Sequence, residues 1–335
     1  MRNRTIFGKV YRRCLCLWAA LCLLLCGSAA GEGASAGETL SIVALNFPGF
    51  DFARHVAGAD ASVTMLLKPG ADSHSYEPSP KDILAIQNAD LFIYTGGESD
   101  TWVERILLSL GEDAPETLRM TDVVTLLAEE HTASMQADHA HDHGEEACDD
   151  PEHHHEAHAE EMDEHVWTAP LNAAAIVDAV AEKLCLLRPE GSEAFLANAA
   201  DYTARIREVD EAFRMVVAEG KRDLIIFGDR FPLRYFAAAY GLRYDAAFPG
   251  CSEDSEPSVR TVISLVDTVR EEQIPVVFHI EYSSQKTARI LAEETGAKLC
   301  LFHGCHTVSA AEIEAGATYV SLMLQNVQAL KEALN

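Results

Sequence analysis

Residues 192–219 read SEAFLANAADYTARIREVDEAFRMVVAE, and their pattern predicts one long amphipathic helix. The larger apolar side chains recur at steps of three and four residues: Phe195, Ala199, Tyr202, Ile206, Val209, Phe213 and Val217. Roughly 28 residues at a rise of 1.5 Å each give a helix of about 42 Å. A helix of that length can run past two small domains, so we expect it to join the two parts of the chain that flank it.

Both flanking parts alternate short apolar strands with amphipathic helices. Ahead of the long helix, strands are expected at 40–45, 63–67 and 91–94, and helices at 50–57, 79–88 and 100–110. Behind it, strands are expected at 223–227, 244–247, 275–280 and 298–302, and helices at 234–240, 259–272, 284–295 and 318–334. Strands separated by helices indicate parallel sheets with right-handed crossovers.

The sequence therefore predicts an α/β fold with two lobes, each a parallel-type sheet flanked by helices, joined by one long rigid backbone helix. We expect an N-terminal lobe at 38–170, linking helices at 171–221 and a C-terminal lobe at 222–335. The composition is that of a globular protein, with 48% hydrophobic and 24% charged residues. The 53 acidic residues against 26 basic ones give a net charge of −27, which argues against a nucleic-acid partner.

Residues 1–36 have the anatomy of a secretory signal peptide. Five basic residues between 2 and 13 precede an apolar run at 14–26, which leads into small residues. Cleavage after Ala30 or Ala36 and lipidation of Cys26 are open alternatives. We expect an exported protein in the periplasm or on the outer face of the cytoplasmic membrane, either free or lipid-anchored.

Residues 129–164 interrupt the α/β pattern with eight histidines and 14 acidic residues in 36 positions. A segment with so few large apolar side chains cannot bury a core, so we expect a mobile loop inside the N-terminal lobe. Its histidines are expected to bind metal weakly and to raise its local concentration, while a solvated linker is the alternative. The expected auxiliary ligands are His139, His141, His143, His153, His154, His155 and His158.

Isolated metal-binding side chains stand where expected strands or loops give way to other elements. His74 follows the strand at 63–67, His165 closes the acidic segment, and Asp229 and His303 each follow an apolar strand. Ligands of open α/β sheets lie at the carboxyl ends of the strands, so a cleft between the lobes could gather all four. Three imidazoles and one carboxylate suit tetrahedral Zn²⁺, whereas Mn²⁺ prefers several oxygens.

Each of these residues also has a simpler interpretation. A single loop histidine can be merely solvated, and Asp229 could cap a helix or pair with Arg230 or Arg234. Glu281, in the string FHIEYSS, is the first substitute for Asp229. Weaker candidates are His279 and His306, and His55 is expected to be structural.

Three strings resemble the zinc/manganese solute-binding proteins of ABC importers, the cluster A-I family. They are GADSHSYEPSP at 70–80, HVWxxPLN at 165–172, and ETGAK…YVxLMxxNV…L at 294–330. The resemblance covers nearly the whole chain after the signal and implies a two-lobed binding protein with one metal at the interface. It carries the first two ligands over to His74 and His165, and the histidine-rich segment resembles the loop of zinc-specific members.

The other two ligand positions depart from the family pattern. This chain has GDRFPLRY, with Asp229, where the family usually has HxAFxY with His or Glu as the ligand. It has His303 where the family usually has Asp or Glu. The carboxylate and the imidazole thus exchange places, which keeps three histidines and one acid.

Five cysteines lie outside the signal. Cys185 and Cys300 stand in apolar runs and are expected to be buried thiols, while Cys148 lies in the charged segment. Cys251 and Cys305 both stand in glycine-flanked loops of a chain expected to be exported, and we predict a disulfide between them. Two free thiols and a Cys–His metal site are the alternatives.

The function expected is the extracytoplasmic zinc-binding component of an ABC importer, which delivers Zn²⁺ to a membrane permease driven by an ATPase. A manganese- or iron-binding component and a transporter-independent zinc buffer or chaperone are the alternatives. We expect a monomer without enzymatic activity, since four protein ligands close the metal site and the sequence has neither HExxH nor GxSxG.

Overall fold

The computed structural model describes residues 39–71, 75–136, 161–250 and 256–335. The predicted signal peptide, His74, Cys251 and the seven auxiliary histidines lie outside the described residues. The chain divides into two units, Met1–Thr39 and Leu40–Asn335, and all described strands and helices belong to the second unit.

The N-terminal lobe contains a four-stranded parallel sheet in the order β2-β1-β3-β4. Its strands are β1 (Leu40–Ala44), β2 (Ala61–Met65), β3 (Leu91–Tyr94) and β4 (Glu116–Arg119). Its helices are α2 (Phe47–Ala57), α3 (Pro80–Gln87) and α4 (Thr101–Leu110). Residue Ile42 of β1 is in register with Val63 of β2 and Leu91 of β3. The sequence did not predict β4, which is short and has an exposed first residue.

The C-terminal lobe repeats this arrangement with the order β6-β5-β7-β8, again all parallel. Its strands are β5 (Leu224–Phe231), β6 (Arg243–Pro249), β7 (Val276–His279) and β8 (Lys298–Leu301). Its helices are α8 (Arg234–Tyr240), α9 (Val259–Glu271), α10 (Lys286–Thr295), α11 (Ala310–Glu314) and α12 (Tyr319–Leu334). The predicted α/β class with two parallel sheets is confirmed.

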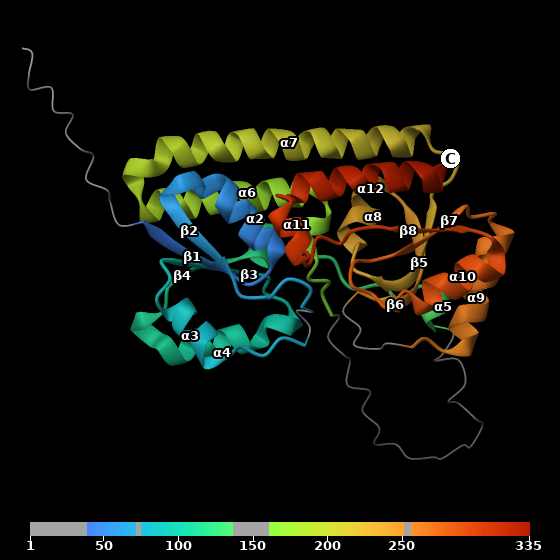
Figure 1. The fold of residues 1–335 in the computed structure, drawn as a ribbon, viewed down its shortest axis with the longest axis horizontal. Coiled ribbons are helices and arrows are strands. Elements are labelled where there is room, and N and C mark those ends of the chain that lie inside the picture. The colour runs from blue at the N-terminus through green and yellow to red at the C-terminus, as the bar shows by residue number, and fades with distance from the viewer. Residues whose placement is uncertain (1–38, 72–74, 137–160, 251–255) are drawn as a thin grey trace, which may run out of the picture. The chain divides into compact units, whose positions relative to one another are not determined.

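Two long helices connect the lobes, α6 (Pro170–Leu187) and α7 (Ser192–Glu219). Helix α7 has the bounds predicted from the sequence, and it packs against α6, α2 and α12 (Figure 1). A fully buried carboxylate joins three of these helices, because Asp51 of α2 accepts hydrogen bonds from the Tyr202 hydroxyl of α7 and the Tyr319 amide of α12. The backbone helix is thereby fixed to elements of both lobes.

The two ends of segment 129–164 are ordered, so the expectation of a loop throughout was wrong for them. The first end forms a short helix, α5 (Ala133–Gln136), and an antiparallel bridge joins Ala128 to Met162. The Ser134 hydroxyl donates to the buried Asp245 carboxylate, 111 residues further along the chain. That polar partner on β6 holds a segment that has too little apolar surface to pack by itself.

The thiols of Cys185 and Cys300 are half-buried, not buried as expected. Cys305 is buried, and no disulfide joins these three cysteines to another described residue. Its predicted partner Cys251 lies outside the described residues, so the bridge stays a prediction. In the described part of the chain, no helix is both long and apolar enough to span a membrane.

Candidate metal centre

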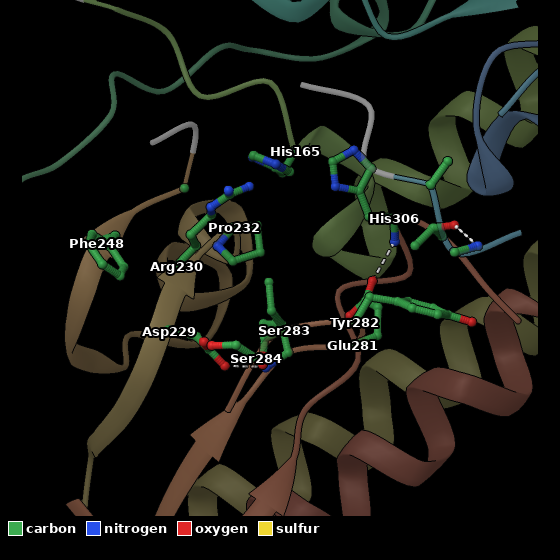
Figure 2. Close-up of a pocket in the computed structure, with 15 residues that line it drawn as sticks. His165, Asp229, Arg230, Pro232, Phe248, Glu281, Tyr282, Ser283, Ser284 and His306 are labelled. Atoms are coloured by element: carbon green, nitrogen blue, oxygen red, sulfur yellow. Dashed lines mark hydrogen bonds between the residues drawn. The ribbon is translucent and has the colours of Figure 1, made fainter. Parts of the chain in front are cut away.

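A cavity of about 250 Å³ is lined by residues of both lobes (Figure 2). Gly70 and Ala71 come from the loop after β2, and His165 comes from the segment before α6. The remaining lining residues lie at the carboxyl ends of strands β5 and β6 or in the loops after β5, β6, β7 and β8, as expected for a ligand site in parallel sheets. They include Asp229, Arg230, Phe248, Glu281, Tyr282, Ser283, Ser284 and His306.

The structure places His165 at this pocket and fixes the orientation of its ring. Its residue is 1% exposed, and the Asp163 Oδ1 atom accepts a hydrogen bond of 2.8 Å from its backbone amide. The same oxygen lies 3.2 Å from Nδ1 of the imidazole. A proton on Nδ1 leaves the lone pair of the neutral ring on Nε2, which is the tautomer a metal-binding histidine needs.

Two hydrogen bonds fix the main chain of Asp163. The hydroxyl of Tyr235 donates to the Asp163 carbonyl oxygen at 2.7 Å, and the Asp163 amide donates to the Leu127 carbonyl. The second carboxylate oxygen, Oδ2, is buried and accepts no hydrogen bond from the described residues. A buried carboxylate of this kind favours a cation nearby, so its position beside His165 suits a metal site.

Asp229 lies at the pocket at the end of β5, but its carboxylate oxygens already form hydrogen bonds with the turn after β7. Its Oδ2 accepts from the Ile280 amide at 3.2 Å, and the carboxylate also hydrogen-bonds Ser283. Burial raises the pKa of the Asp229 carboxyl. A register shift between Phe227 and Arg230 interrupts the pairing of β5 with β6, and a shift of this kind re-aims strand-end side chains. Both Asp229 and Arg230 therefore reach the same pocket.

Gly228 allows this end of β5 to form. A Cβ atom at position 228 would lie 2.3 Å from Cα of Ala288, so only glycine permits α10 to approach the strand this closely. Helix α10 directly follows the segment that places Glu281 and Ser283 at the pocket. The close contact thus positions the floor of the site.

Glu281 also lines the pocket, and it organises the loop after β8. Its Oε2 accepts from the Gly304 amide at 2.6 Å and its Oε1 from the His306 amide at 3.0 Å. Each carboxylate oxygen retains a further lone pair. Glu281, the substitute ligand proposed from the sequence, is therefore hydrogen-bonded to the loop that carries the candidate metal ligands His303, Cys305 and His306.

His303 does not line this pocket. It is 2% exposed, its amide donates to Oδ1 of Asn326, and its Nδ1 accepts from the Cys305 amide at 2.9 Å. An Nδ1 atom that accepts puts the proton of the neutral ring on Nε2, so neither nitrogen offers a lone pair to a metal in this conformation. Its Nε2 is buried and lies 3.8 Å from the Glu312 carboxylate.

His306 lies at the pocket, where His303 was expected. The centroids of the His165 and His306 rings are 5.2 Å apart and the rings are perpendicular. Figure 2 shows these two rings on one side of the pocket, and Asp229, Ser283 and Ser284 on the other. The sequence offered His306 only as a weak candidate, and its one signal was its position in the loop after a strand.

His279 and His55, two further histidine candidates, do not line the pocket. His279 contacts the Ile280 carbonyl through Nδ1, and His55 stacks on Tyr202 with ring centroids 3.9 Å apart. His74 lies outside the described residues, three positions after Ala71, which lines the pocket. Among the described residues, no group of three or more His, Cys, Asp and Glu side chains is arranged to hold a metal ion.

The sequence model of one protein family, described as ZnuA, zinc-uptake complex component A, periplasmic, matches residues 42–333. This match covers both lobes and the helices between them. The chain belongs to the ZnuA family. The resemblance stated from the three sequence strings is thereby confirmed.

Relatives within and around the ZnuA family support the assignment. The zinc-binding lipoprotein AdcA of Streptococcus pneumoniae strain R6 is 31% identical over 316 residues, which are 94% of this chain and 60% of AdcA. The high-affinity zinc uptake system protein ZnuA of Bacillus subtilis is 30% identical, over 94% of this chain and 95% of that protein. The chain thus spans about 60% of the streptococcal relative and nearly all of the Bacillus ZnuA.

A solved structure has the same fold. The Zn(II)-bound ZnuA-like domain of Streptococcus pneumoniae AdcA aligns with a TM-score of 0.71 and 29% identity, over 89% of this chain and 99% of that domain. A further structure titled ZnuA aligns with a TM-score of 0.70 at 20% identity and shows the likeness of fold only. The two-lobed architecture with its backbone helix is therefore that of the ZnuA family.

Proposed function

We propose that this protein is the extracytoplasmic zinc-binding component of an ABC importer and delivers Zn²⁺ to a membrane permease driven by an ATPase. The observation that carries the proposal is the pocket between the lobes, where His165, oriented by Asp163, faces His306. Membership of the ZnuA family and the names of the relatives, a zinc-binding lipoprotein and a zinc uptake protein, support it.

The proposed ligands are His74, His165, His306 and the carboxylate of Glu281. His306 replaces His303 of the sequence prediction because His306 lines the pocket and His303 does not. Glu281 is preferred to Asp229 because its carboxylate accepts from the His306 amide, whereas the Asp229 carboxylate holds the turn at 280–283.

Imidazole-rich coordination is the chemical reason for zinc. Three nitrogen donors with one oxygen suit Zn²⁺ in a tetrahedral site, whereas Mn²⁺ favours sites with more oxygens. Each histidine must be neutral to bind, and the proton on Nδ1 of His165 is stabilised by Asp163. The chain's own residues thus set both the tautomer and the direction of the donor atoms.

The remaining features fit a carrier that collects metal outside the cytoplasm. The seven auxiliary histidines are proposed to collect Zn²⁺ weakly, and Cys26 or a cleaved signal is proposed to determine anchoring. Four protein ligands would leave no coordination position for a reactive water, so no catalysis is expected. We expect the carrier to act as a monomer, with a Cys251–Cys305 bridge that tethers the loop of His306.

Elemental analysis of the purified protein, together with calorimetric titration by Zn²⁺, Mn²⁺ and Fe²⁺, tests the proposal. We expect one tightly bound Zn²⁺ per chain in protein prepared without added metal. Tighter binding of Mn²⁺ or Fe²⁺ than of Zn²⁺ would favour a manganese or iron carrier. Normal growth of a deletion strain under zinc starvation would favour a buffer that works without a transporter.

A further inference from the structure

Tyr282, on the turn after β7, covers the backbone of Gly70 at the edge of the pocket. A Cβ atom placed on Gly70 would lie 2.8 Å from Cε1 of the Tyr282 ring and 3.4 Å from its Cδ1 and Cζ atoms. Gly70 also has a φ of +79°, which side-chain-bearing residues rarely adopt. The ring and the backbone of position 70 therefore meet across the two lobes, and glycine permits the contact for two independent reasons.

The turn that carries Tyr282 is strained. Tyr282 and Gln285 have φ angles of 58° and 59°, in the left-handed region that residues other than glycine rarely adopt. Asp229 holds the turn through the Ile280 amide and Ser283. Strain that the surroundings maintain is a reason to look for a role in function.

A hydrogen bond attaches the same Gly70 loop to a second loop of the C-terminal lobe, the one after β8. The Gly70 amide donates to Oγ1 of Thr307 at 3.1 Å, directly after His306 in the chain. Gly70, Tyr282 and Thr307 all line the pocket, as Figure 2 shows for the labelled Tyr282. The loop at 68–71 is thus attached to the C-terminal lobe twice, once by a ring and once by a hydroxyl, at the edge of the pocket.

We propose that Tyr282 is a positioning residue that clamps the Gly70 backbone against the C-terminal lobe and so slows the release of the bound ion. The inference rests on the proposed zinc-binding function of the same pocket. An ion that leaves toward solvent on this side requires the loops to separate, which breaks the contact of the ring with Gly70. The side chain of Tyr282 is 52% exposed, so it contributes little to the core and can be replaced without unfolding the lobe.

The test is a stopped-flow measurement of zinc dissociation from the full-length protein into an excess of a chromophoric chelator. Tyr282→Ala should dissociate zinc about tenfold faster than the wild type, since burial of about half of an aromatic side chain corresponds to roughly one factor of ten. Tyr282→Phe keeps the ring and should stay within about twofold of the wild type. Ile290→Ala, an exposed apolar truncation on α10 of the same lobe, should leave the rate unchanged.

A double-mutant cycle with Gly70→Ala separates the clamp from a general structural effect. The added methyl group should speed dissociation strongly when the tyrosine ring is present and much less in the Tyr282→Ala background, where only the strain at φ +79° remains. Independent effects in the cycle, or an unchanged dissociation rate in Tyr282→Ala with one zinc per chain, would overturn the clamp. If the wild type does not bind one zinc ion per chain, the proposed function itself fails.

Discussion

Replacing Asp163 by asparagine tests whether this carboxylate supports metal affinity or the stability of the fold. Its Oδ1 accepts from the His165 amide and contacts Nδ1, while Oδ2 is buried without a hydrogen bond from the described residues. An orienting carboxylate behind a histidine ligand is worth 10- to 100-fold in metal affinity, or about 1.4–2.8 kcal/mol. Asparagine keeps one carbonyl oxygen, so we expect a loss of about tenfold.

The stability of the metal-free protein should respond differently. The substitution removes a buried charge, and the Asp163 carbonyl still accepts from Tyr235. We therefore expect an unfolding midpoint that is unchanged or higher in the absence of metal, together with the weaker zinc affinity. Competition titration with a chromophoric chelator measures the affinity, and thermal unfolding of the chelator-treated protein measures the stability.

Asp210→Asn is the matched control. Asp210 is also buried, but it binds Arg214 and the Tyr240 hydroxyl, and it does not line the pocket. This control should lose stability and keep its zinc affinity. If Asp163→Asn retains wild-type affinity, or loses affinity only in proportion to a loss of stability, the orienting role assigned to Asp163 is refuted.

Three further predictions concern other residues of the chain. His306→Ala should lower zinc affinity at least 100-fold in a titration. His303→Ala should keep the zinc affinity but lose about 1–3 kcal/mol of stability in chemical unfolding, because the Cys305 amide loses its hydrogen-bond acceptor. Burial raises the pKa of Asp100 to about 7, so the folded state binds a proton that the unfolded state releases near pH 4, and stability should fall by up to about 4 kcal/mol as pH rises from 4 to 7. Asp100→Asn should abolish most of this fall in thermal melts at pH 5 and 8. A Cys251–Cys305 bridge would close a loop of about 55 residues and add roughly 4 kcal/mol, and mass spectrometry that finds both thiols free in exported protein would exclude it.

The architecture could be predicted because it depends on local patterns. The apolar periodicity of residues 192–219 gave the exact bounds of α7, and the alternation of strands and helices indicated both parallel sheets. Strand β4 was missed because its sequence, ETLR, has only one apolar residue. It is recognisable as a strand only through its pairing with β3.

The site could be predicted only in part, since its details depend on contacts between distant residues. Asp229 and Glu281, which were expected near strand ends, line one pocket together with His165, which was expected at the end of the acidic segment. The choice between His303 and His306 depends on Cys305, whose φ of 56° turns the loop, and on Glu281, which holds the amides of that loop. No sequence pattern predicts the left-handed backbone conformation of Cys305 or the two hydrogen bonds that the Glu281 carboxylate accepts from backbone amides.

The ordered ends of the histidine-rich segment show the same limitation. Their composition favours a loop, but the structure attaches Ser134 to Asp245, 111 residues further along the chain, and Asp163 to Tyr235. Such anchors are single polar contacts, which leave no periodic pattern in the chain. The composition therefore described the segment as a whole and missed the residues where it joins the lobes.

Equilibrium titration with Zn²⁺ of a variant that lacks residues 137–160 tests the central claim most directly. We expect one strong site to remain after the deletion and to disappear when His165→Ala is added, because the pocket and not the deleted segment is proposed to hold the tightly bound ion. A preformed pocket avoids the cost of ordering a chain segment around the ion, about 1–2 kcal/mol for each residue fixed. Loss of the strong site with the deletion, while the full-length His165→Ala variant retains it, would contradict the account.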